Sequence, residues 1–134
     1  MASYILDTNI ISRILAKNPE VERHLEEVVA GNATIVLCPV VFYEIRCGLL
    51  KRDAARKLEG FQILAQRFRW DEIGREDWHT AAELWAESER QGAPRDDADI
   101  LIASHALRLG AILVTDNEDH FRHIGVPTEN WCRA

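Results

Sequence analysis

The sequence predicts an α/β domain with a mostly parallel central sheet. Short apolar runs rich in β-branched residues recur along the chain, as expected for strands that are buried on both faces. Segments with apolar residues at helical spacing separate these runs, which is typical of βαβ units. The 134 residues, 47% of them hydrophobic, are enough for one domain with its own core and exclude a disordered chain.

The expected strands are short. Runs at residues 4–6, 34–38 and 111–115 are predicted to be buried strands. A further short strand is expected at 70–73, and an edge strand within 126–131. Ligands of parallel sheets bind beyond the carboxyl ends of the strands, so the residues that follow these runs are the first candidates for a site.

The expected helices follow from apolar periodicity. Pro19 is well placed in the first turn of one helix, and Gly110 is well placed to end another. Trp78 and Trp85 stand seven residues apart, and we interpret them as a stripe that faces the core. The apolar residues that define the helices lie within 10–15, 21–29, 40–50, 58–68, 78–85 and 100–109.

The composition indicates in which cellular compartment the protein is expected. The apolar runs are far too short to span a bilayer, and the N-terminal segment lacks the basic residues of a signal peptide. Cys38, Cys47 and Cys132 have no spacing typical of a zinc site, and three is an odd number for a disulfide framework. We therefore expect a cytoplasmic protein with no membrane segment.

The formal net charge of −6 argues against a nucleic-acid partner, because phosphate binding favours a basic surface. The charge is unevenly distributed, however. Residues 1–70 hold ten basic and eight acidic residues, a net +2, whereas residues 71–134 hold six basic and fourteen acidic residues, a net −8. The positions of the acidic residues therefore matter more than their number.

Four carboxylates occupy positions that are typical of a site. Asp7 and Asp116 each directly follow a predicted strand. Glu44 and Asp99 are each expected on a helix, with mostly apolar or small neighbours one turn away. Taken singly, each has an ordinary explanation as a helix cap, a first-turn acid, an exposed helix residue or a surface turn.

In a parallel sheet, these four positions can converge at one edge. Clustered carboxylates bind hard divalent cations, which prefer oxygen ligands. Such a site can activate water and stabilise the transition state of phosphodiester cleavage. Histidines compete poorly as ligands here: His105 is expected to be structural, and His120 and His123 lack an obvious third partner, so a zinc site is not favoured.

Four blocks of sequence also follow the order of a known family. The first two are YILDTN and CPVVFYEIRCGL, the second with a glutamate and a glycine four residues later. The last two are DADILIASHALRLGAILVTDNEDHF and IGVPTENW. Together, over residues 4–131, they resemble the PIN-domain ribonucleases, in particular the VapC toxins of bacterial toxin–antitoxin pairs. The resemblance implies a PIN-like three-layer α/β/α sandwich, formed by residues 1–134 as a single domain.

The resemblance implies an endoribonuclease that depends on Mg²⁺ or Mn²⁺. Asp7 and Asp99 match the principal metal-binding aspartates of the family, and Glu44 matches its catalytic glutamate, which is also expected to complete the metal pocket. Four neighbours are expected to support these side chains by hydrogen bonds: Thr8, Asn9, Thr115 and Asn117.

The fourth acidic position of the family is where this chain departs from the pattern. Asn117 falls on that position, and a neutral amide is a poorer ligand than a carboxylate. The adjacent Asp116 is the residue that we expect to serve there, as a catalytic residue and metal ligand. Asn117 itself and Asp119 stay open as alternatives.

The resemblance also implies partners. Basic residues on and after the Glu44 helix are expected to contact the RNA backbone: Arg46, Lys51, Arg52 and Arg56. A VapB-like antitoxin is expected to inhibit the enzyme by binding apolar helices within 10–15 and 49–68. A homodimer is expected within a larger toxin–antitoxin complex, which would bind operator DNA through the antitoxin.

Two other functions stay open at this point. One is a PIN-like RNA-processing nuclease without an antitoxin. The other is a catalytically silent PIN-like binding module, against which the presence of Asp7, Glu44 and Asp99 argues. A receiver-type phosphoacceptor domain is disfavoured, because AILVTDN offers no lysine after the late strand.

Overall fold

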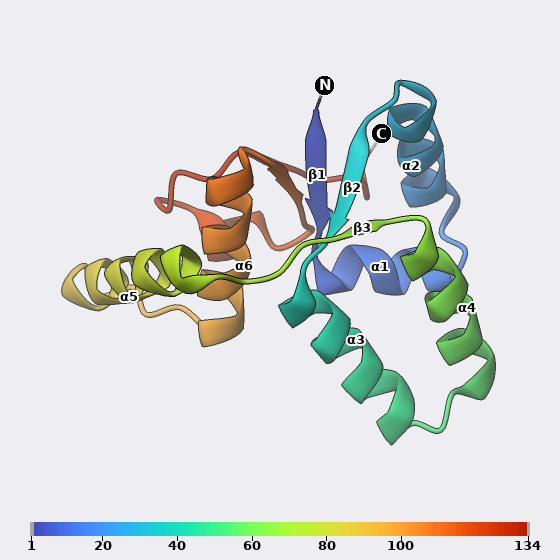
Figure 1. The fold of residues 1–134 in the computed structure, drawn as a ribbon, viewed down its shortest axis with the longest axis horizontal. Helices are drawn as coiled ribbons and strands as arrows, with labels where there is room; N and C mark the ends of the chain where they lie inside the picture. Colours follow the sequence, from blue (N-terminus) through green and yellow to red (C-terminus); the bar gives the residue numbers. More distant parts are fainter. Residues whose placement is uncertain (1, 134) are drawn as a thin grey trace.

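A five-stranded parallel sheet in the order β3-β2-β1-β4-β5 organises the chain (Figure 1). The computed structural model describes residues 2–133. Tyr4 of β1 pairs with Ile35 of β2 on one side and with Ile112 of β4 on the other, so β1 is the central strand. The strands are β1 (Ser3–Leu6), β2 (Thr34–Leu37), β3 (Arg69–Trp70), β4 (Ile112–Val114) and β5 (Thr128–Glu129).

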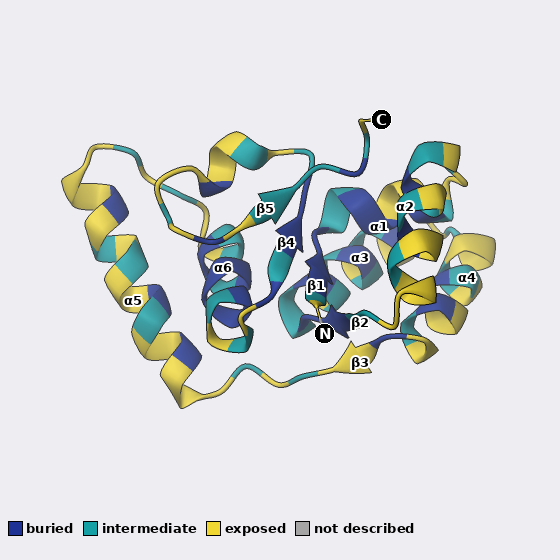
Figure 2. Ribbon diagram, turned by 90° about the horizontal axis from the view of Figure 1, so that it is seen from above, coloured by how far each residue is buried: buried dark blue, intermediate teal, exposed yellow. Residues whose placement is uncertain are grey.

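Helices cover both faces of this sheet, which gives the predicted three layers. Helix α6 lies on one face with α5 outside it, whereas α1, α2 and α4 lie on the other (Figure 2). Helix α3 begins at the carboxyl end of β2 and extends beyond the sheet (Figure 1). The helices are α1 (Thr8–Leu15), α2 (Pro19–Ala30), α3 (Pro39–Lys51), α4 (Ala55–Gln66), α5 (Arg75–Arg90), α6 (Asp97–Leu109) and the 3₁₀ helix η1 (Glu118–Phe121).

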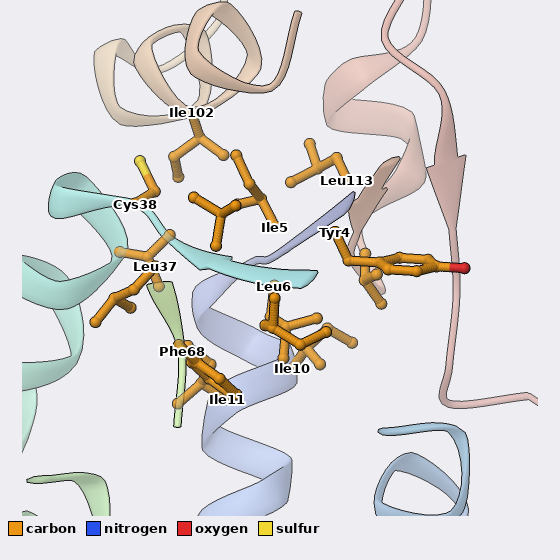
Figure 3. Packing of buried hydrophobic residues seen from close by; sticks show 14 of the residues in the cluster. Tyr4, Ile5, Leu6, Ile10, Ile11, Leu37, Cys38, Phe68, Ile102 and Leu113 are labelled. Atoms are coloured by element: carbon orange, nitrogen blue, oxygen red, sulfur yellow. The ribbon is translucent and has the colours of Figure 1, made fainter. Parts of the chain in front are cut away.

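The core is divided by the alternation of side chains along β1. Ile5 points toward Ile102 of α6, whereas Leu6 points toward Ile10 and Ile11 of α1 (Figure 3). Each of these side chains is no more than 1% exposed. Strands buried on both faces need a continuous apolar sequence, which is the pattern that predicts them.

Local signals in the sequence fix several boundaries. Helix α2 begins at Pro19, and the Asn18 side chain caps it by accepting hydrogen bonds from the backbone N–H groups of Glu20 and Val21. Gly110 ends α6 with a φ of 63°, in the left-handed region that glycine adopts without strain. These expectations are confirmed. The strand expected at 70–73 is misplaced, because β3 covers Arg69–Trp70 and residues 71–73 are not in a strand. The edge strand expected within 126–131 is confirmed but short, as β5 covers Thr128–Glu129.

The interpretation of Trp78 and Trp85 as a core stripe is wrong. Both indole side chains are exposed on α5, at 56% and 48%. The face of α5 that is buried carries Asp77, Ala81 and Ser88 instead. Small residues let α5 approach α6 closely, so the bulky side chains are left on the outer face of the outer helix.

A charged network ties α5 to α6, and we call it the α5–α6 network. Its members are Asp71, Asp77, His105 and Arg108. Arg108 donates hydrogen bonds of 2.7 Å to a carboxylate oxygen of Asp71 and of 2.7 Å to one of Asp77. The fully buried His105 has its Nε2 2.9 Å from the same Asp71 oxygen, which agrees with the structural role predicted for it.

The expectation that Ile10 and Ile11 belong to an antitoxin groove is wrong. Both side chains are buried in the core beneath β1, so they are not available to a partner. Leu15, one turn later, is only partly buried and packs at the edge of the core. Among the described residues, the structure contains no helix long and apolar enough to cross a membrane.

Candidate active site

Asp7 lies where β1 ends beside β4, at the carboxyl edge of the sheet. It is the N-cap of α1, and its Oδ1 accepts a 2.8 Å hydrogen bond from the Thr8 N–H. Its Oδ2 accepts a 2.8 Å hydrogen bond from the Thr115 hydroxyl, and Asn9 Nδ2 lies 3.4 Å from the same oxygen. Asp7 is therefore both a helix cap and a buried carboxylate whose orientation is fixed by hydrogen bonds, as a site residue requires.

Asp99 is the second carboxylate of this edge. It lies in the first turn of α6, where the helix dipole favours a negative charge. Its Oδ2 lies 3.1 Å from Nδ1 of His120, which reaches it from η1. The end of β1, the start of α6 and the loop after β4 thus meet, as the order of elements in a parallel sheet requires.

The surroundings of Asp7 and Asp99 disfavour the charged form of both carboxyl groups. Burial is the main reason why the pKa of Asp7 is raised above its ordinary value of 3.8, although hydrogen bonds from Thr115 and Thr8 act in the opposite direction. Burial also raises the pKa of Asp99, and the negative charge of Asp7 raises it further. Charged carboxylates here repel one another, so a cation would relieve them.

Glu44 lies on α3 and is joined to the site through Thr8. Its Oε1 accepts a 2.7 Å hydrogen bond from the Thr8 hydroxyl, which links α3 to the residue next to Asp7. Glu44 lines a surface pocket of about 200 Å³ between α1, α3 and the start of α4. Two basic residues, Arg52 and Lys57, line the same pocket, and the first of them is among those predicted to face RNA.

Asp116 is turned toward a different partner. Its Oδ2 accepts hydrogen bonds from Arg13 of α1, at 2.5 Å from Nη2 and 3.2 Å from Nε. The Asp116 backbone N–H donates to Asn9 Oδ1 at 3.2 Å, and the Asn117 N–H donates to the Thr115 hydroxyl at 3.0 Å. The loop is therefore fixed to the site, but the Asp116 carboxylate is neutralised at its rim.

We call Asp7, Glu44, Asp99 and Asp116 together the acidic pocket. It lies at the carboxyl edge of a parallel sheet in a three-layer α/β/α domain. The PIN domain family model matches residues 4–127. The chain belongs to the PIN domain family.

Individual relatives of this PIN domain lie among the VapC proteins. Ribonuclease VapC2 of Rickettsia felis is 32% identical over 130 residues, which cover 96% of this chain and 97% of the relative. The tRNA(fMet)-specific endonuclease VapC of Shigella flexneri is 29% identical over 135 residues, which cover 98% of this chain and 99% of the relative.

A solved structure has the same fold. The structure of VapBC2 from Rickettsia felis, bound to a DNA fragment from its promoter, contains a chain that is 30% identical to this one. The two chains superpose with a TM-score of 0.87 over 96% of this PIN domain and 98% of the other chain. The PIN-like α/β/α sandwich expected from the sequence is thereby confirmed.

The donor atoms of this PIN domain suit a divalent cation. Asp7 and Asp99 present carboxylate oxygens, the ligands that Mg²⁺ and Mn²⁺ prefer. Burial is the main reason why their pKa values are raised, and the charge of a neighbouring carboxylate adds to it. Within residues 2–133, however, no three His, Cys, Asp or Glu side chains already form a group arranged to hold a metal. Glu44 and Asp116 are instead engaged with Thr8 and Arg13.

Two polar side chains at the pocket were not predicted from the sequence. Arg13 pairs with Asp116 across 103 positions of sequence, and no local signal indicates such a pair. His120 contacts Asp99 across 21 positions. The place of His120 in the polar segment directly after a predicted strand is a usable signal for such a contact, whereas its spacing to another histidine is not.

Proposed function

We propose that this PIN domain is a divalent-metal-dependent endoribonuclease and the toxin of a toxin–antitoxin pair. The observation that carries the proposal is the pair formed by the buried Asp7 and the partly buried Asp99, which repel one another at the carboxyl edge of the sheet. The names of the relatives, a ribonuclease and a tRNA(fMet)-specific endonuclease, support RNA as the substrate. They favour this function over a silent binding module.

Asp7 and Asp99 would hold Mg²⁺ or Mn²⁺, and Glu44 and Asp116 would complete the pocket around it. When bound, the cation would offset the repulsion between these carboxylates and the RNA phosphate, and would acidify water for attack. Burial, and to a smaller extent the charge of neighbouring carboxylates, raises the pKa values of both aspartates, so a bound cation would stabilise their ionised forms.

The chain's own residues orient the reacting groups. Thr115 and Asn9 hold Asp7 by one oxygen, and the Thr8 backbone holds the other. The Thr8 hydroxyl donates to Glu44 Oε1, which leaves the second carboxylate oxygen of Glu44 available to orient a water or accept its proton. Asn117 contributes through its backbone, which donates to the Thr115 hydroxyl.

RNA would approach over the pocket that Glu44 lines. Arg52 and Lys57 line this surface pocket together with Glu44. Their positive charges lie beside the carboxylates of the acidic pocket, where a phosphate backbone would lie. Arg56 lies in the same turn of α4, and Arg46 and Lys51 lie on α3. We assign all five to the RNA-facing surface, which would give a chain of net charge −6 a local positive surface for nucleic acid.

The antitoxin would bind an apolar groove between α1 and α4. This groove has a volume of about 710 Å³, and its apolar lining comes from Ile14 and Leu15 of α1 and from Ile63 and Leu64 of α4. Charged residues also line it, among them Arg56 and Lys57, so the antitoxin surface would overlap the RNA-facing surface. Ile63 is 59% exposed, so it would present an apolar side chain to a partner in this groove. The VapBC2 complex on promoter DNA supports a VapB-like partner that carries the operator contact, and we also propose a homodimer within the complex.

The test compares the wild type with Asp7→Asn. We expect the wild type to cleave RNA only with Mg²⁺ or Mn²⁺ present, and to arrest growth in bacteria with discrete new 5′ ends in the RNA. Asp7→Asn should reduce cleavage by roughly 10³-fold or more, because it removes a charged oxygen ligand while it keeps the cap hydrogen bond. Cleavage is measured on purified protein, and folding by circular dichroism.

Glu89→Gln is the matched control, since it makes the same change of carboxylate to amide on the exposed face of α5. It should cleave like the wild type. Full activity in a folded Asp7→Asn variant would contradict the proposal. Growth arrest that a coexpressed neighbouring small gene does not relieve would favour an RNA-processing nuclease over a toxin.

A further inference from the structure

His120 is the histidine that reaches into the proposed cation site. It does so from η1, and its Nδ1 lies 3.1 Å from Asp99 Oδ2. Its side chain is 51% exposed, so it borders the site from the solvent side.

Asp116, the residue expected at the fourth acidic position, is committed elsewhere. Arg13 holds its Oδ2 with two hydrogen bonds, so this oxygen faces Arg13. Asp119 is 79% exposed and pairs with Arg122, which directly follows η1. Thr115, directly after β4, donates to Asp7, and His120 from η1 contacts Asp99.

The separation of the two atoms fits a shared cation. Around an octahedral ion with bonds of about 2.1–2.2 Å, neighbouring ligand atoms lie about 3.0–3.1 Å apart. Nδ1 of His120 and Oδ2 of Asp99 already have this spacing. A cation shared by the two atoms would lie off the line that joins them, so the imidazole ring would turn until the lone pair of Nδ1 points at the ion.

We propose that His120 is a ligand of the divalent cation in this PIN domain, so that the site combines carboxylate oxygens with one imidazole nitrogen. The proposal rests on the metal dependence in the proposed function. Mg²⁺ binds nitrogen ligands poorly, whereas transition ions accept imidazole. The site therefore favours Mn²⁺ over Mg²⁺, to a degree that His120 sets.

Pulsed electron paramagnetic resonance of bound Mn²⁺ tests the proposal directly. The wild type should show the hyperfine coupling of a directly bound imidazole ¹⁴N. His120→Ala should lose this coupling and bind Mn²⁺ about tenfold more weakly or worse, because even outer-shell partners of a metal ligand contribute about tenfold or more. Its Mg²⁺ affinity, measured by competition with Mn²⁺, should change less.

Two further variants make the result specific. His79→Ala removes an exposed histidine of α5 and should keep both the coupling and the Mn²⁺ affinity of the wild type. His120→Asp supplies an oxygen ligand in place of nitrogen, so it should bind Mn²⁺ without ¹⁴N coupling and bind Mg²⁺ more tightly than the wild type does.

The outcomes separate the two proposals. Mn²⁺ bound to the wild type without ¹⁴N coupling, or coupling that persists in His120→Ala, would overturn the role of His120 and leave the proposed function intact. A wild type that binds neither Mn²⁺ nor Mg²⁺ would overturn both. Metal-dependent RNA cleavage, measured separately, reports on the proposed function alone.

Discussion

The acidic pocket and the α5–α6 network both gather carboxylates inside the protein, but they neutralise them differently. In the network, Arg108 serves both Asp71 and Asp77. In the pocket, Asp7 and Asp99 have hydrogen-bond donors around them, but among the described residues no lysine or arginine binds them. Carboxylates that the chain neutralises itself hold helices together, whereas those it leaves charged are available to bind a cation.

The pKa shifts of the two regions have opposite signs. Partial burial would raise the pKa of Asp71, but hydrogen bonds from His105 and Arg108, together with the charge of Arg108, hold it below the ordinary value of 3.8. Burial and neighbouring carboxylates raise the pKa values of Asp7 and Asp99. Perturbed carboxylates of the second kind are typical of functional sites.

The largest effect on stability is expected from breaking the network. Arg108→Met leaves the buried Asp77 without its cation, and we expect a loss of about 2–3 kcal/mol in the free energy of unfolding. The loss falls at the lower end for a broken buried pair because Arg108 is partly exposed. Urea denaturation measures it.

Arg90→Met is the control for this variant, since Arg90 pairs with Glu87 on the surface of α5, the helix that carries Asp77. An exposed pair contributes at most about 1 kcal/mol, so the control should be nearly as stable as the wild type. Equal stability of both variants would mean that Asp77 does not depend on Arg108.

The next effect belongs to the acidic pocket. Mn²⁺ at about one hundred times its dissociation constant should stabilise the wild type by roughly 2.7 kcal/mol, because the cation binds only the folded state. Arg108→Met should gain the same increment, since the two regions are independent, whereas Asp7→Asn should gain little. Thermal or urea unfolding with and without Mn²⁺ checks this; an equal gain in Asp7→Asn would show that the cation binds elsewhere.

A smaller effect is expected in the dependence of stability on pH. The raised pKa of Asp7 means that its stabilising contribution is present below 3.8 and is lost as pH rises through the folded-state pKa. Asp7→Asn should therefore be more stable relative to the wild type at neutral pH than in acid.

Asp71→Asn is expected to change the pH dependence of stability in the opposite direction. The lowered pKa of Asp71 means that its contribution is present above 3.8 and is lost as pH falls through the folded-state pKa. This variant should be destabilised at neutral pH, with a deficit that shrinks in acid. Urea midpoints measured across this range compare the two variants, and the same trend in both would contradict the contrast between the two regions.

The smallest expected effect is on RNA binding, and it tests whether the RNA lies beside the acidic pocket. Replacing Lys51, Arg52 and Arg56 together with glutamine should weaken RNA binding and lower its logarithmic salt slope by up to about 2, or about 0.7 for each phosphate that is no longer neutralised. Arg108→Met should leave the slope unchanged. A triple variant with the slope of the wild type would place the RNA elsewhere.

Much of the fold was predictable because its signals are local. The β-branched runs identify β1, β2 and β4, and Gly110 marks the end of α6. The exposed Trp78 and Trp85 were not predictable, because helical spacing identifies a stripe without showing which side of an outer helix the stripe faces. Ile10 and Ile11 illustrate the same limit, since an apolar residue can serve the core or a partner.

The amino-acid pattern alone specifies the alternation of strands and helices and places Asp7, Glu44 and Asp99 at elements that meet at one edge, since periodicity and the rules of parallel sheets are enough for that. The partner of each charge is set by the three-dimensional packing: Arg13 with Asp116, His120 with Asp99. Those pairings join distant positions through loops, and a hydrogen bond depends on tenths of an ångström that no local pattern encodes.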